Sequence, residues 1–165
     1  MTPDRHGSAV IEFPNDLEIV ITRAFDAPIG LVFDVLTKPE HVSVWGATPP
    51  DRMTECLIDL RVGGDYRSSF VTQDGTVFAF SGTYLEVDPP VRTVQTWHFN
   101  CWPDVEAVET MHLDETDGVT TLRWSLAFRD RAGRDHMTEF GGQYDSLDEM
   151  ESILRSVLQE AWTHL

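Results

Sequence analysis

The chain has 165 residues, of which 41% are hydrophobic and 24% are charged. These values are typical of globular proteins, and the length suits one domain with a substantial core. The formal net charge is −16, and Lys38 is the sole lysine among 12 basic residues. Because phosphate backbones and anionic membranes are bound by clustered basic side chains, neither a nucleic acid nor a membrane surface is an expected partner.

The sequence carries no targeting or spanning signal that we recognise. No apolar run approaches the roughly 20 residues that a membrane-spanning helix needs, and residues 1–16 lack the basic and then apolar layout of a secretory signal. Two cysteines, Cys56 and Cys101, are too few for a disulfide framework. We therefore expect a cytoplasmic protein.

The N-terminal part divides into a tail and the start of a domain. Residues 1–15 are polar and irregular, which predicts a flexible tail before a single domain at 16–165. Apolar and polar residues then alternate over 17–25, which predicts a strand.

Two short helices are predicted next. Pro28 suits the first turn of a helix, and Asp26 is available to cap it. Pro39 ends this helix, because the residue before a proline avoids the helical region. A second helix is predicted at 40–45.

A long β region follows, divided by short turns such as Gly63-Gly64 and Asp74-Gly75. Because the turns are short, successive strands are expected to pair in antiparallel fashion. With the strand at 17–25 they make a seven-stranded sheet. The six strands of this region are predicted at 53–61, 66–72, 77–87, 92–99, 105–115 and 119–128.

The C-terminal region predicts one long amphipathic helix at 145–161, about 25 Å in length. Ser146 and Glu149 have the spacing of a capping box at its start, and an earlier start near Met137 is the alternative. A long sheet curls under its own twist, and a lone amphipathic helix must bury its apolar side on that sheet. We therefore expect an α+β helix-grip fold with a cavity, because one helix cannot fill a curved seven-stranded sheet.

Short motifs occur in a regular order within the span from about Leu17 to Trp162. They lie at 21–28 with Val32-Phe33, 36–40 with Trp45-Gly46, 59–64, 74–75, and 80–90 through Thr96-Trp97. Together they resemble the activator-of-Hsp90-ATPase-like family of the START-related superfamily, which includes polyketide cyclases and the birch-pollen allergen. The resemblance implies the same helix-grip fold.

Two positions depart from this family's pattern. The family usually has a Trp pair where this chain has Val44-Trp45, and a Gly-Trp where it has Gly142-Gln143. In the family both positions lie near the pocket mouth, so the resemblance implies a ligand of different size or polarity. The fold serves lipid binders, cyclases, dehydratases and a co-chaperone domain, so function has to be argued from the site.

A pocket lined by aromatic and methionine side chains is the predicted ligand site. Strand alternation places Trp124 and Phe128 on one face of the last strand and Met111 and Leu113 on one face of the strand before it. The alternative, in which each of these residues fills the core, stays open. The predicted lining residues are Trp45, Phe70, Phe80, Trp97, Phe99, Met111, Trp124, Gly142 and Met150.

Acid–base chemistry could use four strand residues, Asp59, Glu86, Glu109 and His112. Glu109 shares the inward parity of Met111, which is costly unless the carboxylate is paired or functional. A solvent-facing ladder of charges is the alternative. The candidate structural partners of Glu109 are Arg23, Arg61, Arg67 and Arg123. No catalytic residue is assigned.

His98, Cys101 and His112 are of the residue types that bind zinc. Alternation places His98 on the face opposite Trp97, so it is expected to face solvent. No metal and no other cofactor is predicted.

These features predict a module that binds a small hydrophobic or aromatic molecule between the sheet and the C-terminal helix. Two alternatives stay open: a cyclase- or dehydratase-type enzyme, and a co-chaperone-like protein-interaction module. Exposed edge strands are compatible with a homodimer.

Overall fold

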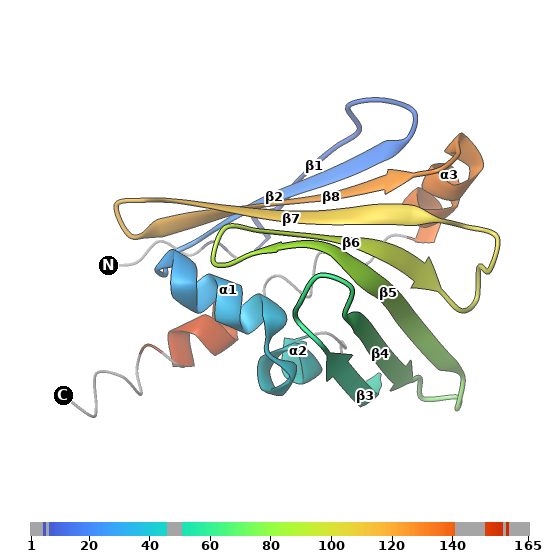
Figure 1. Cartoon of the computed structure of the whole chain (residues 1–165), viewed down its shortest axis with the longest axis horizontal. Coiled ribbons are helices and arrows are strands. Elements are labelled where there is room, and N and C mark those ends of the chain that lie inside the picture. The colour runs from blue at the N-terminus through green and yellow to red at the C-terminus, as the bar shows by residue number, and fades with distance from the viewer. Residues whose placement is uncertain (1–4, 6, 46–50, 141–150, 157, 159–165) are drawn as a thin grey trace.

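A computed structural model of the chain describes residues 5, 7–45, 51–140, 151–156 and 158 (Figure 1). Its main feature is a single eight-stranded antiparallel sheet. Neighbouring strands follow one another along the chain except where β2 lies beside β8. The strands in spatial order are β1 (Val10–Glu12), β2 (Glu18–Phe25), β8 (Val119–Phe128), β7 (Ala107–Thr116), β6 (Arg92–Phe99), β5 (Val77–Asp88), β4 (Asp65–Val71) and β3 (Arg52–Ile58).

The predicted count of seven strands is wrong by one. The additional strand is β1, which lies within the segment 1–15 and pairs with β2 through Val10 and Thr22. Three residues are too few for alternation to be recognised in a sequence. The pairing partner, and not the local pattern, makes this segment a strand.

The two short helices are confirmed as α1 (Ile29–Thr37) and α2 (Pro39–Trp45). The predicted cap of α1 is wrong. Asp26 pairs with Arg5 at 2.9 Å, and the first N–H of the helix, that of Ile29, donates to the carboxylate of Glu115 at 2.6 Å. Pro28 itself is extended and makes no side-chain cap.

The long C-terminal helix differs from its prediction. A ten-residue helix, α3 (Arg131–Phe140), follows β8. Its start is marked by Asp130, whose carboxylate accepts the N–H of Gly133 at 2.8 Å, as helix-capping side chains do. Residues 151–156 are also helical, and much of the predicted span 145–161 lies outside the described residues. No helix in the described part of the chain is long and apolar enough to span a bilayer.

The helices gather mainly on one side of the sheet. α1, α2 and the helical residues 151–156 lie on the same side, whereas α3 lies at the end of β8 (Figure 1). Leu154 packs into the same core as Trp45, Trp97 and Phe99. The alternation predicted for the last strand is confirmed, because Leu122 is fully buried and its neighbour Arg123 is exposed. The sheet therefore has an inner face, which packs against these helices, and an outer face.

Candidate functional site

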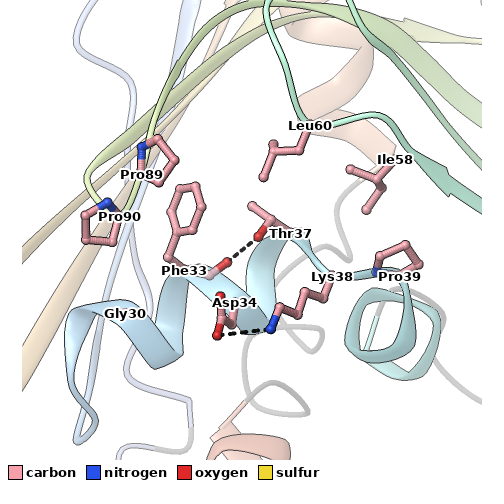
Figure 2. Close-up of a pocket in the computed structure, with 10 residues that line it drawn as sticks. All are labelled: Gly30, Phe33, Asp34, Thr37, Lys38, Pro39, Ile58, Leu60, Pro89 and Pro90. Carbon is pink, nitrogen blue, oxygen red and sulfur yellow. Dashed lines mark hydrogen bonds and ion pairs between the residues drawn. The ribbon is translucent and has the colours of Figure 1, made fainter.

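A groove of about 620 Å³ opens between α1 and the end of the sheet (Figure 2). This volume is in the range of small-molecule sites. The rim carries an ion pair between Asp34 and Lys38 at 3.3 Å. Apolar side chains predominate on its walls. The lining residues are Gly30, Phe33, Asp34, Thr37, Lys38, Pro39, Ile58, Leu60, Pro89 and Pro90.

Three segments that are distant in sequence make this groove. One wall is the corner between α1 and α2, where Lys38 is extended because a proline follows it. Ile58 ends β3, and Leu60 follows it. Pro89 and Pro90 form the turn between β5 and β6. In Figure 2 these side chains and that of Phe33 surround one space.

A second, much smaller cavity lies further inside. It has a volume of about 10 Å³ and is lined by α1 together with the inner face of β6 and β7, including Thr93 and Met111. Phe33 and Thr37 line both this cavity and the groove. The groove and the small cavity therefore lie next to one another along α1.

Three polar side chains meet on that inner face, and we call Gln95, Glu109 and Trp124 the inner polar cluster. Gln95 Nε2 donates to Glu109 Oε1 at 2.7 Å, and Trp124 Nε1 donates to Glu109 Oε2 at 2.8 Å. Gln95 is 4% exposed and Glu109 is 6% exposed. Burial raises the pKa of Glu109, and the two hydrogen bonds oppose that rise.

Two tyrosines stand beside the cluster. Tyr84 lies opposite Gln95 in the register of β5 and β6, and the ring of Tyr66 is 5.6 Å from that of Tyr84. The Tyr66 hydroxyl donates to the carbonyl of Thr96 at 2.8 Å, across Gly82, where a Cβ would come within 2.7 Å of the ring. Burial, and then the charge of Glu109, raise the pKa of both phenols.

The predicted aromatic residues are largely brought together. Phe80 lies 4.7 Å from Phe99, 5.6 Å from Trp97 and 5.6 Å from Phe70 between ring centroids. Trp45 joins the same core, and its indole N–H donates to the carbonyl of Val35 at 2.8 Å.

The remaining predicted lining residues divide into two groups. Met111 and Trp124 are partly buried at the edge of the core, and Met111 lines the small cavity. Gly142 and Met150 lie outside the described residues, as does Gln143. Of the predicted residues that the structure describes, none lines the groove.

The predicted arginine partner of Glu109 is wrong. Arg23 pairs with Glu151 at 3.3 Å, Arg61 with Asp59, and Arg67 with Glu55, while Arg123 points to the outer face. Among the described residues, the hydrogen-bond partners of the Glu109 carboxylate are Gln95 and Trp124. The inward parity of Glu109 is confirmed, so a solvent-facing ladder is excluded at this position.

The other ionisable candidates lie elsewhere. Glu86 is an exposed partner of Arg92, and His98 is exposed as its parity predicts. His112 lies opposite Arg92, six positions from His98 along β6, so these histidines do not meet. In the ranges that the structure describes, no group of three or more His, Cys, Asp or Glu residues could hold a metal ion.

Sequence reasoning missed Gln95 and the groove. Gln95 could have been found, because it shares the inward parity of Trp97 and Phe99 and is a polar residue on an apolar face. The groove could not, since its walls come from three separate segments.

An antiparallel sheet whose inner face packs against helices, with a groove at one end, defines the helix-grip class of proteins. The family model described as "Activator of Hsp90 ATPase homolog 1-like protein" matches residues 26–155, and the chain belongs to this family.

Known proteins are similar to this chain in sequence or in fold. A Schizosaccharomyces pombe protein named "Uncharacterized protein C1711.08" is 30% identical over 71% of this chain, and the match spans 31% of that protein's length. A solved structure from Rhodobacter sphaeroides has a TM-score of 0.82 at 19% identity and covers 90% of this chain and 98% of its own. One from Nitrosomonas europaea has a TM-score of 0.79 at 24% identity and covers 89% of this chain and 99% of its own. These two structures share the fold.

Proposed function

We propose that the chain binds a small hydrophobic or aromatic molecule, which enters by the groove and lies against the inner face of the sheet. The observation that carries this proposal is the groove itself, which has a volume of about 620 Å³ and mostly apolar walls. Phe33 and Thr37 line both the groove and the inner cavity, so the two spaces are adjacent.

The aromatic residues of the inner face support the same proposal. Trp97 and Phe99 are 4% and 2% exposed, as expected for a filled core. Phe70, Phe80 and Trp124 face the same interior by their register, yet each keeps part of its surface accessible. Apolar surface that faces inward and remains accessible is where an apolar ligand gains binding energy.

The test uses N-phenyl-1-naphthylamine, a neutral apolar dye whose fluorescence rises in an apolar site. We expect saturable binding by the wild-type protein. Leu60→Trp adds bulk to the groove wall and should weaken binding about tenfold or more. Leu57→Trp is the matched control, because Leu57 lies on the outer side of β3 and is 58% exposed. Its affinity should equal that of the wild type.

Native mass spectrometry of the freshly purified protein provides the second measurement. A bound small molecule at near-stoichiometric level would support the proposal. An empty protein that also fails to bind the dye would contradict it, as would equal binding by Leu60→Trp and the wild type.

Two alternatives each have one supporting observation. The description of the matching family model favours a co-chaperone-like module, and the test is stimulation of Hsp90 ATPase activity by this chain. The buried carboxylate of Glu109 favours a cyclase- or dehydratase-type enzyme. In that case a small molecule carried by the purified protein would be converted on incubation, and Glu109→Gln would abolish the conversion without loss of dye binding.

A further inference from the structure

Within the inner polar cluster, one hydrogen-bond acceptor has no donor in the part of the chain that the structure describes. The indole N–H of Trp124 and one N–H of Gln95 already bind the carboxylate of Glu109. The carboxylate requires a donor, so it orients the Gln95 amide with Nε2 towards itself and Oε1 away from it. Gln95 Oε1 is buried and has no hydrogen-bond partner among the described residues.

An unpaired buried acceptor is costly, and natural proteins keep few of them. Gln95 could have been replaced by an apolar residue if packing were its only role, because its neighbours along β6 on the same face include Trp97. Because the amide N–H of Gln95 binds Glu109, the amide oxygen is turned away and is left without a donor from the described residues. A ligand that donated a hydrogen bond to it would remove this cost.

The cluster lies within reach of the proposed ligand site. Gln95 and Glu109 each stand two residues along the strand from Thr93 and Met111, which line the small cavity. Two residues of strand span about 7 Å. That cavity shares Phe33 and Thr37 with the groove, and both side chains are visible in Figure 2.

The charges of the described residues restrict the ligand further. No cation pairs with Glu109 in the part of the chain that the structure describes, and the two neighbouring phenols do not neutralise a carboxylate. The whole chain also carries a net charge of −16. An acidic ligand would therefore meet repulsion at the cluster when Glu109 is ionised, and its carboxylate would bring no donor to Gln95 Oε1.

We propose that Gln95, Glu109 and Trp124 form a recognition site that selects apolar molecules carrying a hydrogen-bond donor, such as a hydroxyl or N–H group, against molecules that offer only acceptors or a carboxylate. Gln95 Oε1 accepts the ligand's hydrogen bond, Glu109 orients Gln95, and Trp124 anchors Glu109. This assignment rests on the proposed function, because it names the ligand class of the same interior site.

The experiment compares three probes that share one ring system. The donor is 2-naphthol, 2-methoxynaphthalene offers an acceptor only, and 2-naphthoate is an anion. Binding is followed by ¹H–¹⁵N NMR titration, with the Trp124 indole resonance identified from its loss in Trp124→Phe. For the wild type we expect 2-naphthol to bind about three- to tenfold more tightly than 2-methoxynaphthalene, the effect of one hydrogen bond. The Trp124 resonance should shift with 2-naphthol, and 2-naphthoate should bind most weakly.

Two variants test whether Gln95 Oε1 is the acceptor. In Glu109→Gln the new amide N–H can donate to Gln95 Oε1, so this oxygen no longer needs a donor from the ligand. The variant should therefore bind 2-naphthol and 2-methoxynaphthalene about equally. Gln95→Met with Glu109→Met removes both polar groups at similar volume and should bind 2-methoxynaphthalene at least as tightly as the wild type does. Val108→Ala, on the outer face of β7, is the control and should keep the full preference.

The outcomes separate this inference from the proposed function. Equal binding of 2-naphthol and 2-methoxynaphthalene by the wild type would overturn the recognition site but leave ligand binding in place. A hydroxyl preference that persists in both variants would overturn the role of Gln95. Failure of all three probes, together with failure of the dye, would overturn the proposed function as well.

Discussion

Two buried carboxylates are compensated in different ways. Glu151, in the helical residues 151–156, lies 3.3 Å from Arg23 on β2 and 3.8 Å from Arg155. Glu109, on β7, is held by Gln95 and Trp124, which are neutral. The ion pair makes Glu151 part of the scaffold and joins the helical segment to the sheet. The donors to Glu109 carry no charge, and this is the region where we propose that a ligand binds.

The largest expected effect comes from breaking the scaffold pair. Arg23→Met leaves Glu151 buried without its partner on β2, and the loss of a partner from a buried pair typically costs about 3–5 kcal/mol in free energy of unfolding. Denaturation in urea measures this loss. Arg67→Met is the control, since Arg67 and Glu55 form an exposed pair that should contribute about 1 kcal/mol or less. Equal losses in the two variants would mean that Arg23 does not anchor the helical segment.

A smaller effect is expected from removing one donor to Glu109. Trp124→Phe deletes an N–H that binds a carboxylate, and this should cost about 1.5–3 kcal/mol when Glu109 is ionised. Trp45→Phe also deletes an indole N–H, but one that donates to the backbone carbonyl of Val35. This loss should cost about 1 kcal/mol in free energy of unfolding. The cost of Trp124→Phe should grow as the pH rises through the pKa of Glu109, whereas that of Trp45→Phe should not. The same pH dependence in both variants would contradict the assignment.

The smallest expected effect is the pH dependence of Glu109→Gln. Burial raises the pKa of Glu109 above its ordinary value of 4.5, so the folded protein keeps this proton to a higher pH than the unfolded chain does. The contribution of Glu109 to stability is therefore greatest below pH 4.5 and falls as the pH rises through the folded-state pKa. Glutamine does not titrate, so the stability of the variant relative to the wild type should increase over that window. Urea denaturation at a series of pH values measures the difference in free energy of unfolding between the variant and the wild type. If this difference is constant with pH, the pKa of Glu109 is the same in the folded protein as in the unfolded chain, and the assignment is contradicted.

Local patterns predicted much of the sheet but little of the polar chemistry. Seven strands and two helices followed from alternation and from proline positions, and the inward parity of Glu109 and Trp124 was visible in the same alternation. The partner of Glu109 was not. Parity defines which face a side chain occupies, but Arg23 and Gln95 share that face, and only the register of β6 and β7 places Gln95 opposite Glu109. The start of α3 had a local signal in Asp130, which was missed.

The sequence by itself determined the family, the order of elements and the face of each strand residue, because these depend on periodicity and on residues close together in the chain. The tertiary structure decided the features that depend on distant segments. Glu115 caps α1 from 86 residues away, Val10–Glu12 becomes a strand only beside β2, and the groove exists only where α1, β3 and the β5–β6 turn meet. It also decided that Arg23 neutralises Glu151 and leaves Glu109 to neutral donors, since a buried charge is compensated by whichever group the fold brings within a few ångströms.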